Sequence, residues 1–319
     1  MIITTSFLLF LLSLFLLYIG GESVVKGAVL IASKLQIPVL IIGLTVVSFA
    51  TSLPEVFVSV EALLKGNSNI ALGNVFGSNI ANIALVLGLT TIISKLNISK
   101  DTIYINYPFL LFVTFLIGFI FYFFGSLSSF SGFFLISLLI LFLYFLISRN
   151  NNQPLNSSLD NNKPSNINVS LFNGLLFLIF GIILLRYGAY LLIEQTILIA
   201  EFFNIPDRVI AATIVAFGTS IPELVTSVIA AIRKQVDLAV GNLIGSNIFN
   251  LLAVLGFSSV ISDIVIDDFA ILNFDYLFML FTTILVSLFI YFNSIKQINR
   301  IHGIILVLVY FIYVCLNIL

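Results

Sequence analysis

Residues 43–88 read GLTVVSFATSLPEVFVSVEALLKGNSNIALGNVFGSNIANIALVLG, and residues 211–256 read AATIVAFGTSIPELVTSVIAAIRKQVDLAVGNLIGSNIFNLLAVLG. Aligned at a constant offset of 168 and without gaps, the two segments share 21 identities over 46 positions. Chance similarity between apolar segments would not preserve both T-S-x-P-E and G-S-N-I-x-N. The chain therefore contains an internal repeat, and this repeat decides the fold.

The composition places the repeat in a membrane. The chain has 319 residues, of which 61% are hydrophobic and 8% charged, and its mean hydropathy is +1.22. A soluble domain carries about 25% charged residues, so a water-soluble enzyme is excluded. The apolar runs are long and continuous, which indicates membrane-spanning helices rather than the alternating strands of a β-barrel. The net charge of −1 gives no indication of a nucleic-acid partner.

We predict an all-α polytopic fold with ten transmembrane helices, at about 20 residues per span. The first five are expected at 4–32, 37–64, 70–94, 105–124 and 130–148, and the second five at 170–200, 206–232, 238–260, 273–292 and 301–318. Residues 1–148 and 171–319 would be two five-helix repeats, joined by a polar, Asn-rich linker at 149–170. Five spans separate equivalent points of the repeats, so the two copies are expected to be inverted across the membrane.

Basic residues set the expected orientation. With the N-terminus outside, ten of the 13 Lys and Arg residues fall on the inner side, and only Lys65, Arg186 and Arg208 fall outside. We therefore expect a multi-pass protein of the plasma membrane with both termini outside and the linker in the cytoplasm.

Each repeat places one acid inside an apolar helix, Glu55 in the first copy and Glu223 in the second. A charge at this depth is costly and indicates a functional site by default. No basic residue lies within nine positions of either acid, which disfavours a purely structural ion pair. Pro54 and Pro222 precede the acids and are expected to open the helices, freeing carbonyl oxygens that line a cavity.

Further polar groups recur beside these acids. Hydroxyls flank each expected break, at Thr51, Ser52, Thr219 and Ser220. The next helix of each copy carries a Ser and an Asn four residues apart, hence on one face: Ser78 with Asn82, and Ser246 with Asn250. All of these groups are hard oxygen donors, which suit Ca²⁺ better than soft transition metals. Two carboxylates would neutralise one divalent cation.

ATSLPE, GTSIPE and the two GSNI-x-N segments resemble the α-repeats of the Na⁺/Ca²⁺ exchanger family, within the cation/Ca²⁺ antiporter superfamily. The resemblance covers both repeats and is to the short prokaryotic type. It implies a secondary active antiporter that transports Na⁺ and Ca²⁺, with no enzymatic activity and no cofactor. It also implies that Glu55 and Glu223 bind Ca²⁺, helped by carbonyls at Thr51 and Thr219. The Na⁺ or shared positions that it implies are Ser48, Ser52, Ser78, Asn82, Ala216, Ser220, Ser246 and Asn250.

The resemblance also carries expectations about the ions. One Ca²⁺ leaves two carboxylates neutral and three Na⁺ leave a charge of +1, so a 3:1 exchange would be electrogenic. Many relatives, including the K⁺-dependent branch, have Asp where this chain has Asn250, so we expect K⁺-independence. TSLPE and TSIPE replace the GNA-type motifs that are typical of cation/proton exchangers, which favours Na⁺ as the counter-ion.

Other functions stay open at this point. The nearest alternative is Ca²⁺/H⁺ exchange, or exchange of another divalent cation for a monovalent one. A channel is disfavoured because filters usually form in symmetric oligomers, and a membrane scaffold would not need duplicated buried acids. The expected partners are the two ions and the lipid bilayer, and no obligate protein partner is evident.

Overall fold

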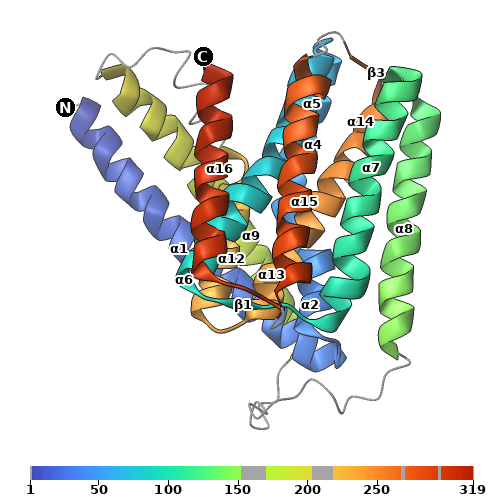
Figure 1. Cartoon of the computed structure of the whole chain (residues 1–319). Coiled ribbons are helices and arrows are strands. Elements are labelled where there is room, and N and C mark those ends of the chain that lie inside the picture. The colour runs from blue at the N-terminus through green and yellow to red at the C-terminus, as the bar shows by residue number, and fades with distance from the viewer. Residues whose placement is uncertain (1, 152–169, 203–217, 267–269, 294–295, 319) are drawn as a thin grey trace.

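The computed structural model describes residues 2–151, 170–202, 218–266, 270–293 and 296–318, which form a helical bundle (Figure 1). Within these residues, eight helices are long and apolar enough to cross a membrane, and a bent helix pair gives a ninth candidate span. Nine of the ten predicted spans therefore have a counterpart. The predicted span 206–232 is described only from residue 218 onward.

The first half of the chain begins with the long helix α1 (Ile2–Leu35), followed by a bent span. That span comprises α2 (Val39–Ile42), the π-helical turn η1 (Gly43–Val47), α3 (Ser48–Thr51) and α4 (Leu53–Leu64). The next span is continuous and comprises α5 (Ser68–Ile80), the π-helical η2 (Ala81–Val86) and α6 (Leu87–Ile93). The half is completed by β1 (Leu96–Asn97), η3 (Thr102–Asn106), α7 (Tyr107–Phe124), β2 (Ser126–Leu127) and α8 (Ser129–Asn151).

The described part of the second half follows the same order. It begins with α9 (Leu171–Phe202) and continues with α12 (Ile221–Ile232). A continuous span then comprises α13 (Val236–Phe249), the π-helical η5 (Asn250–Val254) and α14 (Leu255–Ile261). The remaining elements are β3 (Ile264–Val265), η6 (Ile271–Tyr276), α15 (Leu277–Phe292), β4 (Gln297–Ile298) and α16 (Arg300–Ile318).

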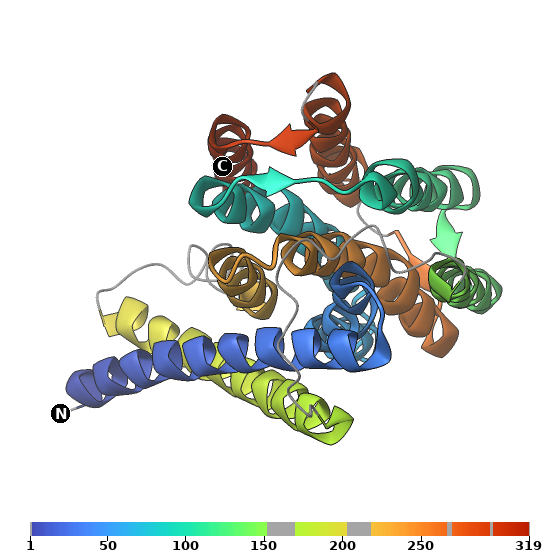
Figure 2. The ribbon, with the colours of Figure 1, turned by 90° about the horizontal axis from the view of Figure 1, so that it is seen from below.

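Helices α1 and α9 lie side by side and inclined to the other helices, along one side of the bundle (Figures 1 and 2). Their backbones are close, because a Cβ added at Gly20 would lie 2.8 Å from the amide nitrogen of Leu185, and one at Gly27 would lie 2.6 Å from that of Leu178. As Gly20 faces Leu185 and Gly27 faces Leu178, the two helices run antiparallel. Small residues at such contacts are the usual means of close packing between membrane helices.

Short antiparallel strand pairs join the two halves at both ends of the bundle. Leu96 of β1 pairs with Ile298 of β4, and Leu127 of β2 pairs with Ile264 of β3. Leu96 and Ile264 are separated by the repeat offset of 168, yet β1 and β3 lie at opposite ends of the molecule (Figure 1). Each half thus supplies one strand to each end.

Contacts between helices also join the two halves in a reciprocal way. Gly88 of α6 packs against Gly303 of α16, and Gly256 of α14 packs against Gly132 of α8. The last helix of each half therefore covers the third span of the other half. Two tyrosines show the same reciprocity, because the hydroxyl of Tyr107 donates to the carbonyl of Thr283 and that of Tyr276 donates to the carbonyl of Thr114, at 2.7 and 3.1 Å.

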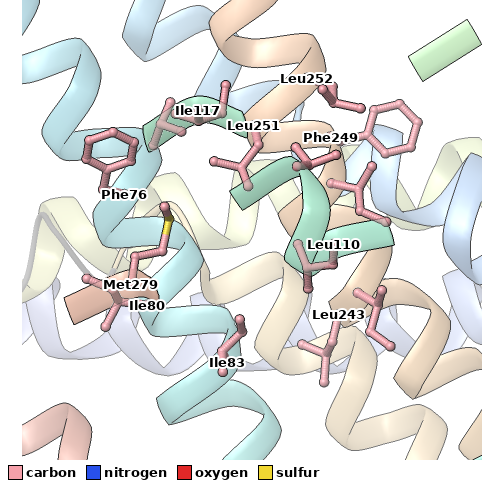
Figure 3. Close-up of a cluster of buried hydrophobic side chains, with 14 of the residues drawn as sticks. Phe76, Ile80, Ile83, Leu110, Ile117, Leu243, Phe249, Leu251, Leu252 and Met279 are labelled. Carbon is pink, nitrogen blue, oxygen red and sulfur yellow. The ribbon is translucent and has the colours of Figure 1, made fainter. Parts of the chain in front are cut away.

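The main hydrophobic core lies where α5–η2 and α13–η5 meet the helices of both halves. Figure 3 shows part of it, with side chains from helices that are distant in sequence packing together. The labelled residues are Phe76, Ile80, Ile83, Leu110, Ile117, Leu243, Phe249, Leu251, Leu252 and Met279. Many of these side chains are fully buried. They fix the two continuous spans, which carry four of the predicted site residues: Ser78, Asn82, Ser246 and Asn250.

Candidate cation-binding site

A break in the second span presents Glu55. Helix α3 ends at Thr51 and α4 begins at Leu53, with a bend of 41° between the two parts of the span. Pro54 is the second residue of α4, where its missing N–H removes no helical hydrogen bond. Glu55 therefore lies in the first turn of a helix, where the free N–H groups and the helix dipole stabilise negative charge.

The second half presents Glu223 in the same way. Helix α12 begins at Ile221 after Ser220, Pro222 is its second residue, and Glu223 lies in its first turn. The backbone at Ser52 and Ser220 is nearly identical, with φ and ψ of −85° and 2° at one position and −87° and 3° at the other. The same five-residue motif thus forms the same local structure in both halves.

Both carboxylates are completely buried and poorly satisfied by protein. Neither oxygen of Glu55 has a hydrogen-bond partner among the described residues, and the same is true of Oε2 of Glu223. Oε1 of Glu223 accepts a hydrogen bond from the hydroxyl of Ser52 at 3.4 Å. The two acids are close enough for their charges to interact. A buried charge without a partner is unfavourable, so this arrangement requires a cation or protons.

The two halves meet at this site through their hydroxyls. The Oγ1 of Thr51 lies 3.4 Å from the Oγ of Ser246, and the Oγ1 of Thr219 lies 3.4 Å from the Oγ of Ser78. Thr51 corresponds to Thr219 and Ser78 to Ser246 at the repeat offset, so the two contacts are equivalent. The predicted Ca²⁺ positions Thr51 and Thr219 are therefore brought next to the predicted Na⁺ positions Ser246 and Ser78.

The two central asparagines lie where each continuous span changes its helical geometry. Asn82 is the second residue of η2, and Asn250 is the first residue of η5. Both side chains are fully buried, and their amide oxygens and nitrogens have no hydrogen-bond partner among the described residues. π-Helical turns within helices are frequent at functional sites. The sequence singled out these asparagines but gave no sign of the π-helical turns.

The remaining predicted positions differ in their surroundings. Ser48 is buried, and its hydroxyl donates to the carbonyl of Gly43 at 2.8 Å, so its hydrogen is used within its own helix. Ser220 is buried, and its hydroxyl has no partner among the described residues. Ala216 lies outside the described residues.

Four buried or half-buried polar residues beside the site were not predicted from the sequence. Asn74 donates to Ser59 at 3.0 Å, and Asn242 donates to Ser227 at 3.0 Å. These bonds tie each acid-bearing helix to the helix that follows it. The sequence did contain a signal for these four residues, because the Asn of a G-N pair and the Ser of an S-V pair recur at equivalent positions of both repeats.

Charged residues elsewhere form pairs away from the site. Glu61 and Lys65 form an exposed i,i+4 pair at 2.6 Å. Arg233 binds Glu22 through two nitrogens, with a shortest distance of 2.6 Å, and so joins the end of α12 to α1. The sequence did not predict this pair.

The donor set fits a cation held by oxygen ligands. No cluster of three or more His, Cys, Asp or Glu side chains occurs in the described part of the chain. The Ser52 hydroxyl lies beside Glu223, and the acid-bearing helices α4 and α12 pack against η5 and η2, the turns that carry Asn250 and Asn82. Such a set matches the ligand preferences of Ca²⁺ and gives no soft ligand for a transition metal.

Comparisons with known proteins agree with this geometry. The family model described as sodium/calcium exchanger protein matches residues 5–148 and 173–319. The putative antiporter CaxA of Alkalimonas amylolytica is 36% identical over 315 residues, covering 98% of both chains. The sodium/calcium exchanger MaX1 of Methanosarcina acetivorans is 32% identical and covers 97% of both. A solved structure of the sodium-calcium exchanger NCX_Mj, soaked with Na⁺ and Ca²⁺, has 31% identity and a TM-score of 0.82, with 98% of both chains covered. The family match across both halves and the near-complete coverage of these relatives establish that the chain belongs to the sodium/calcium exchanger family, in its short prokaryotic form.

Proposed function

We propose that this protein is a secondary active antiporter that exchanges Na⁺ for Ca²⁺ across the membrane. The observation that carries the proposal is the pair of buried acids, Glu55 and Glu223, with three of their four oxygens lacking a partner among the described residues. Two such carboxylates match the charge of one Ca²⁺. Both ions are substrates in this proposal, and no cofactor takes part.

The proposed mechanism is alternating access by two inverted five-helix repeats, residues 1–148 and 171–319, joined by the linker 149–170. Two observations support inversion. The equivalent strands β1 and β3 lie at opposite ends of the bundle (Figure 1), and the contacts Thr51–Ser246 and Ser78–Thr219 are reciprocal. In transporters of this kind, one part of the protein moves against the other around a site at their interface.

We propose that Glu55 and Glu223 bind Ca²⁺ together with carbonyls at Thr51 and Thr219. Na⁺ would use the surrounding oxygens at Ser48, Ser52, Ser78, Asn82, Ala216, Ser220, Ser246 and Asn250. The unpartnered amides of Asn82 and Asn250 support their inclusion, because a buried amide without hydrogen bonds is unfavourable unless a ligand satisfies it. Three Na⁺ against one Ca²⁺ would move one net charge per cycle.

The decisive experiment is ⁴⁵Ca²⁺ uptake into proteoliposomes that contain the purified protein, with and without an outward Na⁺ gradient. The proposal expects uptake only with the gradient, and near-complete loss in Glu55→Gln and Glu223→Gln. Glu61→Gln is the matched control, because Glu61 lies in the same helix as Glu55 but is exposed and paired with Lys65. Uptake driven equally well by a proton gradient would instead favour Ca²⁺/H⁺ exchange. Flux that continues after the gradients have collapsed would favour a channel.

We also propose that exchange does not require K⁺, because Asn250 is neutral and offers no charge to balance an additional cation. The test replaces K⁺ by an inert organic cation in the same proteoliposomes. Undiminished flux supports the proposal, and Asn250→Asp is then expected to make the flux sensitive to K⁺ or to pH. Loss of wild-type flux without K⁺ would contradict it.

The proposed location is the plasma membrane, with both termini outside and the linker in the cytoplasm. Helix α1 begins and α16 ends at the end of the bundle opposite to β1 (Figure 1). Four basic residues flank the β1–β4 pair, namely Lys95, Lys100, Lys296 and Arg300. In a Cys315→Ser background, a cysteine introduced at Asn161 should react with an impermeant reagent only from the cytoplasmic side. Labelling of intact cells from outside would contradict this orientation and show that the linker lies outside.

A further inference from the structure

Asn242 links the two halves of the site through both ends of its side-chain amide. Its Nδ2 donates to the Oγ of Ser227 at 3.0 Å, and its Oδ1 accepts from the Oγ1 of Thr51 at 3.3 Å. All three side chains are buried. Ser227 belongs to α12 and Thr51 to α3, so one buried amide connects the acid-bearing helix of one half with the helix break of the other.

The hydrogen bond between Asn242 and Ser227 affects the site because Ser227 lies one helical turn after Glu223. Ser227 follows Glu223 by four residues in α12, so the two side chains lie on the same face of that helix. A hydrogen bond that holds Ser227 therefore holds the helical turn next to the Glu223 carboxylate. Through Asn242, the location of Glu223 is tied to that of Thr51.

The first half has the same amide but not the same link. Asn74 corresponds to Asn242 at the repeat offset, and its Nδ2 donates to the Oγ of Ser59 at the same distance, 3.0 Å. The same nitrogen also donates to the backbone carbonyl of Glu55, at 3.2 Å. Both of these acceptors lie in the first half. The described structure thus contains a link between halves at Asn242 and a link within one half at Asn74.

The Asn242 amide also helps to orient the Thr51 hydroxyl. An amide oxygen can only accept, so Thr51 is the donor in this bond. The hydroxyl hydrogen of Thr51 has a second acceptor at the same distance, because the carbonyl of Ser48 also lies 3.3 Å from its Oγ1. Replacing the amide would leave the Thr51 hydroxyl to donate within its own helix and would remove its link to the other half through Asn242.

We propose that Asn242 is a positioning residue that sets the placement of Thr51 relative to Glu223 and thereby raises the affinity of the site for its divalent cation. This rests on the proposed function of the site as a Ca²⁺ site. Asn242 acts through Thr51 and Ser227 and is not itself a ligand. Oxygen ligands of Ca²⁺ lie within a narrow range of about 2.3–2.6 Å, so a small displacement of one half against the other weakens binding.

The test is a double-mutant cycle on equilibrium ⁴⁵Ca²⁺ binding to the purified full-length protein in detergent. Asn242→Leu removes both hydrogen bonds at similar volume, and Thr51→Val removes the hydroxyl but keeps the backbone carbonyl. Each single variant is expected to raise the Kd for Ca²⁺ about tenfold, the scale of one lost buried hydrogen bond. Both substitutions break the same link. The Kd for Ca²⁺ of the double variant should therefore be at most about twofold higher than that of the single variant that binds more weakly.

Asn74→Leu is the matched control. Combined with Thr51→Val, it should change the Kd by the product of the two single effects, because Asn74 makes no contact with Thr51 among the described hydrogen bonds. If Asn242→Leu does not fold, Ser227→Ala severs only the α12 side of the link and should show the same non-additivity with Thr51→Val.

The outcomes distinguish a failure of the proposed function from a failure of the positioning role of Asn242. Wild-type protein that binds no Ca²⁺ would overturn the proposed function. Wild-type protein that binds Ca²⁺, with multiplicative effects of Asn242→Leu and Thr51→Val, would overturn only the positioning role. Equal non-additivity in the Asn74 cycle would also overturn it, because the effect would then reflect general loosening of the site.

Discussion

Gly241→Ala tests whether helix packing outside the site controls the site itself. Gly241 lies where α13 packs against α2 and η1, and a Cβ at this position would lie 2.6 Å from the carbonyl oxygen of Leu40 and 3.1 Å from the amide nitrogen of Leu44. Both neighbours are backbone atoms and cannot rotate away. Overpacking of this kind destabilises by about 1–3 kcal/mol, and the better helix propensity of Ala returns about 0.5–1 kcal/mol. We expect a net loss of about 1 kcal/mol in the free energy of unfolding.

The displacement should reach the site. η1 continues directly into α3, which ends at Thr51, and Gly245 one turn after Gly241 contacts Ser48. Moving α13 away from η1 therefore separates Thr51 from Ser246. We expect the thermal midpoint to fall by a few degrees and the Kd for Ca²⁺ to rise, both measured on purified protein in the same detergent.

Gly88→Ala is the control for stability alone. Its added Cβ would lie 2.8 Å from a side-chain carbon of Val307 and 3.0 Å from the carbonyl oxygen of Gly303, at the contact of α6 with α16. It should lower the thermal midpoint by a similar amount without changing the Kd. An equal change of Kd in both variants, or an unchanged Kd in a destabilised Gly241→Ala protein, would refute the reasoning.

Three further predictions concern contacts away from the acids. Glu22→Gln should lower the free energy of unfolding by up to about 1 kcal/mol, because the pair with Arg233 is partly exposed; melting at low and high salt checks this, since the loss must shrink as salt rises. Lys65→Gln should change it by no more than about 0.5 kcal/mol, and a larger loss by melting would contradict the surface assignment. Tyr107→Phe removes the hydroxyl that donates to the buried carbonyl of Thr283 and should destabilise by about 0.5–1.5 kcal/mol with an unchanged Kd for Ca²⁺. A changed Kd would show that this contact acts on the site.

The sequence predicted the spans well because long apolar runs leave little freedom in a membrane. The expected span 130–148 corresponds to a helix at Ser129–Arg149, and 238–260 corresponds to Val236–Ile261. The membrane location followed from the composition, whereas the family and the antiport function followed from motifs that lie in one stretch of each repeat. The ten-helix count stays a prediction, because part of 206–232 lies outside the described residues.

The sequence was less informative about local geometry. It predicted that Pro54 opens its helix near Thr51 and Ser52, and the structure interrupts the span at Ser52, but the sequence did not indicate that Pro54 would lie in the first turn of a new helix. A proline in the sequence predicts that a helix is disturbed. At the second position of a new helix, however, a proline fits without losing a hydrogen bond. The surrounding packing decides whether the chain forms a kinked helix or begins a new one. The π-helical turns at Asn82 and Asn250 have no local signature, since they depend on how each span fits its neighbours.

Not all contacts between the two halves could be predicted from the sequence, because the repeat is not exact. Duplication predicts that equivalent residues have equivalent surroundings, and the contacts Thr51–Ser246 and Ser78–Thr219 obey this rule. Asn242 and Asn74 break it, because one amide reaches the other half and the other stays within its own. An exact repeat would build a symmetric site, but one divalent cation and several monovalent ions impose different demands on the same oxygens. Departures from symmetry, such as Asn242 bound to Thr51, are therefore where selectivity between the two ions should be sought.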